Sequence, residues 1–460
     1  MRNYRIVALT VSTALFMQYL DATALNTAIP AIARDFKVPA LDLNLAILSY
    51  QLAMTVLIPA GTALAERTGQ RNAFVASLGL FMAGSILCAM SWSLPSLVAA
   101  RALQGAGSAV MVPVSRLLVV RAVDKSELLN AMNWLLLPAI VGPMIGPAVG
   151  GEIVTYSSWH WIFLINIPIA LIGMVLTLAI VPDVRDTTGG RLDLVGMALI
   201  APAIFCLMFG LEGAANPKVD WLAPVLLSAG TMFGWLYLRH ARASASPVFD
   251  LSLLRIASFR HSLVAGSILR TAAAATGFVM PLWLQLGMGM SAAKSGAILV
   301  ASAFGTIASR IAGVPLSRVV HPRNVAIGGA ALTVVALLIT SRLTTDWPIA
   351  AFYVVLGFQA IVVSMSMMVV SATTYVNIGS DQMANAAGVF STFQQLTMSL
   401  GVTIGVWMLS GSQLFYHTGD RDIRIYSAAY VLLAILAAAG AISTCKLDVQ
   451  STGALQDARR

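Results

Sequence analysis

The chain has 460 residues, of which 58% are hydrophobic and only 10% are charged. A soluble globular protein carries about a quarter charged residues, so the composition excludes that class and predicts a polytopic protein whose partner is the lipid bilayer. The formal net charge is +9, but the basic residues stand singly between apolar runs, without clusters or interleaved aromatic residues. The positive charge therefore does not indicate a nucleic-acid partner.

The reactive side chains do not indicate an enzyme. The three cysteines lie in or beside apolar runs without paired spacing, so they predict neither a disulfide nor a metal site. The sequence shows no nucleophile–base constellation and no metal-ligand spacing. We therefore expect neither catalysis, nor a bound metal, nor a cofactor.

Apolar runs of about twenty residues, each long enough to cross a bilayer, recur along the chain. Arg2 and Arg5 precede the first run as in a signal peptide, but no small-residue cleavage site follows, so an uncleaved span is expected. Fourteen helical spans are predicted, over 6–29, 43–65, 73–92, 95–118, 128–152, 159–182, 193–213, 219–239, 259–287, 292–317, 323–343, 346–372, 384–410 and 423–445.

The distribution of basic residues predicts the orientation. With the N-terminus inside, the inner loops and tails hold eighteen of the 28 Lys and Arg residues and the outer loops hold seven. The remaining three, Arg101, Arg270 and Arg310, lie within predicted spans. Loops on the cytoplasmic side carry the excess of positive charge, so both termini are expected in the cytoplasm.

The longer polar connections divide the spans into groups of six, two and six. The expected parts are an N-terminal six-helix bundle (1–182), linker loops with two additional spans (183–258), a C-terminal six-helix bundle (259–445) and a cytoplasmic tail (446–460). A faint repeat supports this plan, because GTALAERTGQR (61–71) and GVPLSRVVHPR (313–323) each place a Gly ten residues before an Arg, at the same loop of each bundle. Paired repeats of this kind build many secondary transporters.

Asp21 is the carboxylate that needs a functional explanation. Of the nineteen acidic residues, it alone lies well inside an apolar run, while the others fall in loops, tails or the ends of runs. A charge in the hydrocarbon region costs roughly 2.5 to above 10 kcal/mol, so an intramembrane carboxylate is a functional hypothesis by default.

Arg101, in the segment RALQGAG, is the expected partner of Asp21. It lies about six residues into a span that begins at the outer face of the membrane. At a rise of 1.5 Å per residue, this places it at a depth similar to that of Asp21. A buried pair is the least costly way to keep both charges ionised. A purely structural ion pair is the alternative.

Two further segments predict tight turns and close packing. The predicted loop from Gly61 to Arg71 has glycines for a tight turn at Gly61 and Gly69. Its charged residues, which can pair with one another or bind lipid headgroups, are Glu66, Arg67 and Arg71. The alternative is an ordinary basic turn. The fifth span carries bending prolines and packing glycines at Gly142, Pro143, Gly146, Pro147, Gly150 and Gly151. Plain helix packing is the alternative there.

These segments together resemble the major facilitator superfamily, in particular its fourteen-span drug:proton antiporter branch of the EmrB/QacA type, and are closest to its MdtD-like members. The matching segments are LDATALNTAIP (20–30), GTALAERTGQR (61–71), RALQGAG (101–107), GPMIGPAVGG (142–151), WHWIFLINIPI (159–169) and NAAGVFSTFQQLTMSLG (385–401). Glu66 stands where Asp is usual, and Gln70 where a basic residue is common. The two Trp residues of the fifth of these segments are expected to anchor at the membrane interface.

The resemblance implies an all-α major facilitator fold in a bacterial cytoplasmic (inner) membrane. It implies that Asp21 couples transport to protons, with Arg101 and Gln104 as its regulating partners. The Gly61–Arg71 loop would belong to the inner gate, and the fifth-helix motif would favour export. The protein would then be a monomeric, proton-driven exporter of small molecules of the multidrug type.

The substrate and its charge stay open. Candidate cavity residues are Gln18, Asn26, Arg270, Gln285, Gln394 and Gln395. If Arg270 faces the cavity, an anionic metabolite or a metal chelate such as a carboxylate is an alternative to a cationic drug, although a structural role for Arg270 is an equal possibility. An importer would be expected to lack the fifth-helix motif, and a membrane sensor to carry a soluble domain.

Overall fold

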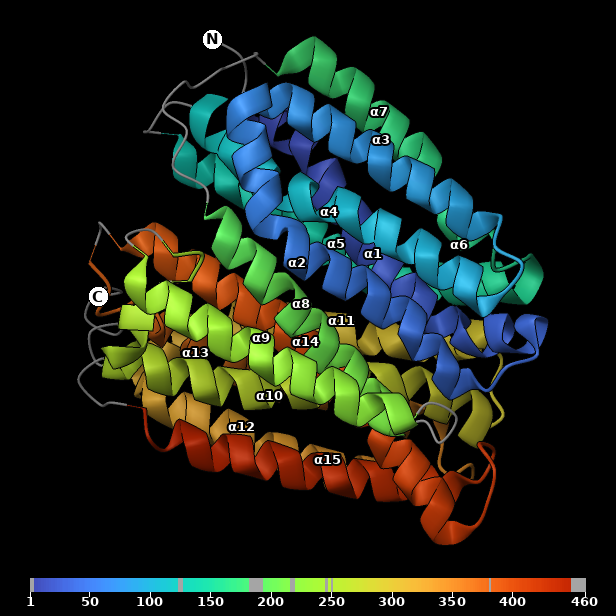
Figure 1. Ribbon diagram of the computed structural model, residues 1–460. Coiled ribbons are helices and arrows are strands. Elements are labelled where there is room, and N and C mark those ends of the chain that lie inside the picture. Colours follow the sequence, from blue (N-terminus) through green and yellow to red (C-terminus); the bar gives the residue numbers. More distant parts are fainter. Residues whose placement is uncertain are drawn as a thin grey trace. The chain divides into compact units, whose positions relative to one another are not determined.

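The computed structural model describes residues 4–122, 127–181, 193–215, 220–244, 247–249, 251–379 and 382–447. Every regular element within these ranges is helical (Figure 1). The α-helices are α1 (Tyr4–Phe36), α2 (Asn44–Thr68), α3 (Gln70–Ala89), α4 (Leu94–Ala122), α5 (Leu128–Tyr156), α6 (Trp161–Leu164), α7 (Asn166–Ile180), α8 (Leu194–Ala215), α9 (Ala223–Ala243), α10 (Ala257–Leu282), α11 (Ala292–Val319), α12 (Pro322–Thr340), α13 (Ile349–Thr373), α14 (Met383–Tyr416) and α15 (Ile423–Thr444). Short 3-10 turns occur at Ala40–Leu43, Asp220–Leu222 and Leu251–Arg255, and a π-helical turn at Trp283–Gly287.

Twelve helical segments in the described part of the chain are long and apolar enough to cross a membrane. Two predicted spans, 128–152 and 219–239, are not among the twelve, although helices α5 and α9 occupy those positions. The prediction of helices is therefore correct at both places. The protein is an all-helical, multi-pass membrane protein.

The chain forms two compact units. The first comprises Met1–Leu207, Leu227–Tyr237 and Ser291–Gly296, and the second Met208–Leu226, Leu238–Met290 and Ala297–Arg460. The additional helices α8 and α9 are thus divided between the units.

The same order of helix packing occurs in both units. In the first unit α1 packs along α5, α4 and α7, and α3 packs on α4 and α7. In the second unit α10 packs along α14, α13 and α15, and α12 packs on α13 and α15. This correspondence extends the faint sequence repeat to five helices of each unit.

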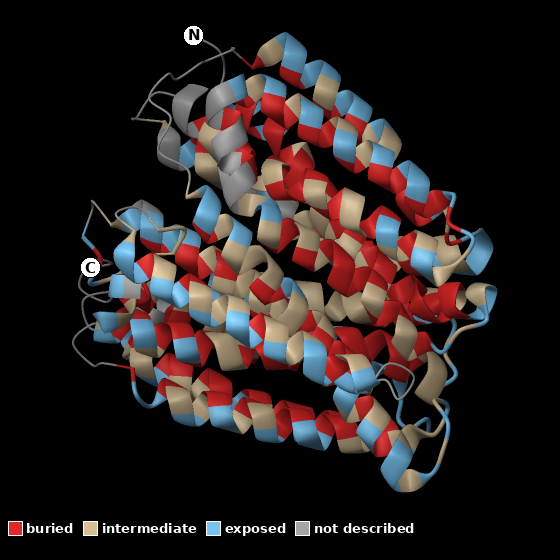
Figure 2. Cartoon of the chain, viewed as in Figure 1, coloured by how far each residue is buried: buried red, intermediate tan, exposed pale blue. Residues whose placement is uncertain are grey.

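The core of the first unit is built from α1, α2, α3, α4, α5 and α7, and it contains Leu15, Phe74, Phe81 and Met111. Large apolar side chains on the outward face of α7, such as Ile172 and Val175, are 56% and 65% exposed. Figure 2 shows buried and exposed positions along the same helices. Exposed apolar surface of this kind is favourable where lipid replaces water.

A break in the sixth predicted span separates α6 from α7 at Ile165. Pro168 has no N–H to donate to the carbonyl of Leu164, four residues earlier, so the helical hydrogen-bond ladder is interrupted there. The break places Asn166 in the first turn of α7.

Candidate functional site

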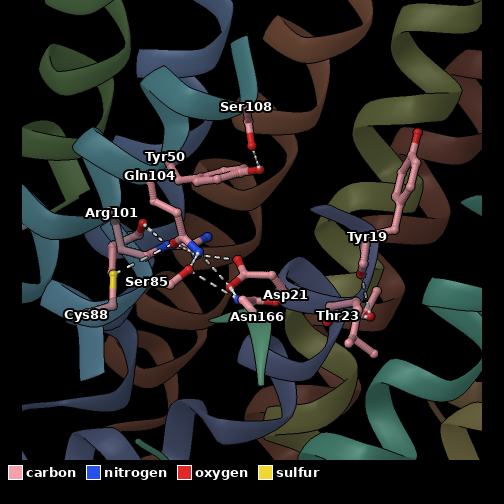
Figure 3. Close-up of polar contacts among 12 residues, drawn as sticks. Tyr19, Asp21, Thr23, Tyr50, Ser85, Cys88, Arg101, Gln104, Ser108 and Asn166 are labelled. Carbon is pink, nitrogen blue, oxygen red and sulfur yellow. Dashed lines mark hydrogen bonds and ion pairs between the residues drawn. The ribbon is translucent and has the colours of Figure 1, made fainter. Parts of the chain in front are cut away.

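Asp21 lies in the middle of α1 and is only 1% exposed. The Arg101 guanidinium, from α4, forms an ion pair with it and donates to Oδ2. Gln104, one turn further along α4, donates from Nε2 to Oδ1 of Asp21 at 2.9 Å. Figure 3 shows the three side chains converging. The structure thus brings together the three residues that the sequence predicts as a group.

Arg101 is held by more than its ion pair. Its Nη1 also donates to Gln104 Oε1 at 2.6 Å, and its Nε donates to the Ala46 carbonyl at 3.4 Å. Its guanidinium lies over the Tyr50 ring, 4.2 Å from the ring centroid. Such hydrogen bonds and stacking offset the cost of burying a charge that is 1% exposed. The pair is neutral as a whole, but protonation of Asp21 would leave the Arg101 charge uncompensated.

Further polar side chains complete this network, and none of them was predicted from the sequence. Asn166 of α7 donates to Asp21 Oδ1 at 3.0 Å. Gln104 donates to the hydroxyl of Ser85 at 2.9 Å, and the Cys88 thiol donates to Gln104 Oε1 at 3.7 Å. The Tyr50 hydroxyl contacts Ser108 at 2.6 Å. One feature of the sequence could have pointed to Asn166, because it is the amide residue in the matched segment WHWIFLINIPI.

Small residues explain how α4 reaches this position. A Cβ on Gly105 would lie 2.3 Å from the Tyr50 carbonyl oxygen, and one on Gly107 would lie 2.6 Å from the Phe81 backbone nitrogen. Glycine at these places lets α2 and α3 approach α4 until backbones touch. Two glycines of RALQGAG thereby bring Tyr50 and the α3 side chains up to the ion pair.

The glycines of the fifth-span motif pack on the turn of α1 that carries Asp21. A Cβ on Gly142 would lie 3.1 Å from Tyr19 Cβ, one on Gly146 would lie 1.9 Å from Thr23 Oγ1, and one on Gly150 would lie 2.7 Å from the Ala24 carbonyl oxygen. A Cβ on Gly151 would instead meet the Ala292 carbonyl at 2.4 Å. Pro143 and Pro147 lie within the same helix.

The segment from Gly61 to Arg71 was predicted as an inner loop, but it is helical almost throughout. Residues 61–68 form the end of α2, residues 70–71 begin α3, and only Gly69 lies between the two helices. Gly69 has φ of +92°, a conformation that favours glycine, and it separates the two helices. A Cβ on Gly61 would lie 2.7 Å from a Val110 methyl carbon, so this glycine packs α2 on α4. Arg71 is half-buried. The side chains of Glu66 and Arg67 lie outside the described residues.

The proposed cavity residues fall into both units. In the first, Gln18 donates to the Met54 sulfur at 3.3 Å, and Asn26 is half-buried. In the second, the half-buried residues are Arg270, Gln285, Gln394 and Gln395. Arg270 lies over the Phe390 ring at 5.2 Å from its centroid, and no acidic side chain among the described residues forms an ion pair with it.

One expectation needs correction, and a second carboxylate proves to be buried. Trp159 was expected at the membrane interface, yet it is 5% exposed and its indole N–H donates to Asp35 at 2.9 Å, whereas Trp161 is 56% exposed. Glu212 was placed with the acids at the ends of apolar runs, and it does lie in the last turns of α8, but it is only 7% exposed. Asp21 is therefore not the only buried carboxylate.

Comparison with solved structures shows the fold. The nucleoside transporter NupG, crystallised as a point mutant, matches with a TM-score of 0.63 and 11% identity, covering 97% of this chain and all of that one. A bacterial homologue of the human lysosomal transporter Spinster matches with a TM-score of 0.62 and 14% identity, covering 100% of this chain and 98% of that one. At these identities the likeness concerns the fold alone.

Comparison with known sequences shows the relatives. The multidrug resistance protein called MdtD from Klebsiella pneumoniae (strain 342) is 35% identical over 94% of this chain and 92% of its own length. The protein of that name from Shigella flexneri serotype 5b is 36% identical over 88% of this chain and 86% of its own length. The family model described as Major Facilitator Superfamily matches residues 11–402. The chain is therefore a membrane transporter that belongs to the Major Facilitator Superfamily.

Proposed function

We propose that the protein is a proton-coupled exporter that works by alternating access, with Asp21 as the proton-carrying group. The observation that carries the proposal is the ion pair between Asp21 and Arg101, each only 1% exposed, in membrane-spanning helices. Relatives named for multidrug resistance support small-molecule efflux as its role.

The geometry suggests how proton binding and conformation depend on each other. A guanidinium beside a carboxylate favours the charged form, whereas a dry environment without a partner favours the neutral acid. A conformational change that separates Asp21 from Arg101 would therefore promote proton uptake, and a change that restores the pair would promote release. By linkage, protonation then favours one conformation over the other.

Helix α5 is the element that would transmit the movement of α1. Its glycines Gly142, Gly146 and Gly150 face residues from Phe16 to Ala24, on both sides of Asp21. Because glycine has no side chain, α5 lies close against the backbone of α1 and the side chains of Tyr19 and Thr23 at these positions. Three prolines also interrupt the hydrogen-bond ladder of α5.

The proposal includes fourteen spans, both termini in the cytoplasm, and a place in the inner membrane of a bacterium. The excess of basic residues in the inner loops supports the orientation. The bacterial source of the relatives supports the location.

The test is transport into proteoliposomes with an imposed pH gradient, with ethidium as a cationic probe and a tricarboxylate as an anionic one. We expect the parent to transport one of the probes in response to the gradient and Asp21→Asn to lose at least 90% of that activity while still inserting. Gradient-driven transport by Asp21→Asn at the parent's rate would refute the role of Asp21.

A second candidate is the export of an anionic metabolite or a metal chelate such as a carboxylate. It is favoured by the half-buried Arg270, whose guanidinium has an aromatic ring but no carboxylate partner among the described residues. An unpaired cation is complementary to an anionic substrate. Arg270→Gln should then reduce tricarboxylate transport and spare ethidium, whereas equal loss of both would argue against this candidate.

A further inference from the structure

Asn166 is the polar member of an inward stripe on α7. The buried positions of this helix are Asn166, Ala170, Gly173 and Thr177, spaced as one helical face. The other face carries large apolar side chains, among them Ile172 at 56% exposed. The amide of Asn166 is fully buried and faces the ion pair (Figure 3).

Only half of the hydrogen-bonding capacity of this amide is used. Its Nδ2 donates to Asp21 Oδ1 at 3.0 Å and approaches the Ser85 hydroxyl at 3.4 Å. Its Oδ1 is buried and makes no hydrogen bond with any described residue. Leaving a buried acceptor unsatisfied destabilises a protein, so its presence needs an explanation.

A neutral Asp21 would need such an acceptor. A protonated carboxyl group has an O–H that must donate, and this arrangement surrounds Asp21 with donors. Gln104 Oε1 already accepts from Arg101 at 2.6 Å and from Cys88 at 3.7 Å. Rotation of the Asn166 amide by about half a turn exchanges its N–H group for Oδ1, because the two ends of an amide have the same shape.

The titratable groups around Asp21 cannot replace Asn166 as the acceptor of the carboxyl proton. Arg101 has donors only. The Cys88 thiol contacts Gln104, and the Tyr50 hydroxyl contacts Ser108 at 2.6 Å. Asn166 is thus the neighbour of Asp21 with an acceptor that makes no other hydrogen bond among the described residues.

We propose that Asn166 is a positioning residue of the proton site that serves both forms of Asp21. It donates from Nδ2 to the carboxylate, and after its amide rotates it accepts the carboxyl proton on Oδ1. The inference rests on the proposed function, since it presumes that Asp21 is protonated in the transport cycle. It adds α7 to the helices that respond to the proton.

The experiment is infrared difference spectroscopy of the full-length protein in liposomes, recorded between high and low pH. In the parent, a C=O band of a protonated carboxyl group should appear at low pH and vanish in Asp21→Asn. In Asn166→Leu, which has a similar volume and no polar group, this band should move to higher wavenumber, because the acid has lost its acceptor. Thr177→Val, which removes a hydroxyl bonded to Gly173 of the same helix, is the control and should leave the band in place.

The outcomes separate the two claims. A band that Asp21→Asn removes but Asn166→Leu leaves unshifted would overturn the role of Asn166 and leave the proposed function standing. A spectrum without an Asp21 band would overturn both. If Asn166→Leu does not fold, the parent with carbon-13-labelled asparagine decides: protonation should shift a side-chain amide band that Asp21→Asn leaves unshifted, and an amide band that stays in place would overturn the inference.

Discussion

Arg101 illustrates at the scale of one residue why a buried charge needs a complete set of partners. Its guanidinium bonds to Asp21, to Gln104 and to the Ala46 carbonyl, and it covers the Tyr50 ring. Removing one partner of a buried ion pair leaves an uncompensated charge, whereas replacing both partners does not.

We therefore expect Arg101→Leu to destabilise the protein by roughly 3–5 kcal/mol. The double variant Asp21→Asn, Arg101→Leu should recover part of that loss, because no charge then stays buried alone. Thermal unfolding in detergent measures both variants. A double variant with a melting temperature lower than that of Arg101→Leu would show that the two charges are not coupled.

Asp422 provides the matched control for removing a carboxylate. It lies just before α15, where hydrogen bonds from Arg424 lower its pKa to about 2. A depressed pKa means that Asp422 stays ionised above about pH 2 and does not titrate between pH 5 and 8. Asp422→Asn should therefore leave the pH dependence of transport unchanged, since Asn also caps a helix N-terminus. A changed profile would show that this surface carboxylate takes part in coupling.

At the scale of elements, the close contact between α1 and α5 depends on the α5 glycines, which have no side chain. The Cβ of Gly150→Ala would lie 2.7 Å from the Ala24 carbonyl oxygen and 2.8 Å from its Cα, and backbone cannot yield as a flexible side chain does. Gly388 of α14 has open space around its Cβ position.

We expect Gly150→Ala to cost roughly 1–3 kcal/mol through overpacking and to reduce transport at least tenfold. Gly388→Ala should keep or slightly raise stability, because Ala is the better helix former. The unfolding temperature and the transport rate of the two variants test both expectations. Normal transport by Gly150→Ala would show that α5 need not fit closely against Asp21's helix.

The sequence allowed the helices and the central pair to be predicted, but not the completed site. Depth along a helix follows from residue counting, so Asp21 and Arg101 could be matched. Which face of each helix turns inward depends on tertiary packing, and for this reason Ser85, Cys88 and Asn166 were missed. For the same reason, the sequence did not show that the Trp159 side chain is buried and donates to Asp35.

At the scale of the whole molecule, the predicted orientation rests on the distribution of basic residues and can be tested with a natural cysteine. Cys445, at the end of α15, is exposed, whereas Cys88 is buried and Cys206 is half-buried. In a Cys206→Ala background, a membrane-impermeant maleimide should label Cys445 in inside-out vesicles and spare it in right-side-out ones. The reverse pattern would place the C-terminus outside.

The central claim is that Asp21 exchanges protons for substrate, and proton movement driven by substrate tests it most directly. Proteoliposomes with an internal pH dye receive a gradient of the transported probe and no pH gradient. We predict that the parent moves protons against the substrate flux, that Asp422→Asn does the same, and that Asp21→Asn moves none. Proton movement by Asp21→Asn at the parent's rate would contradict the account.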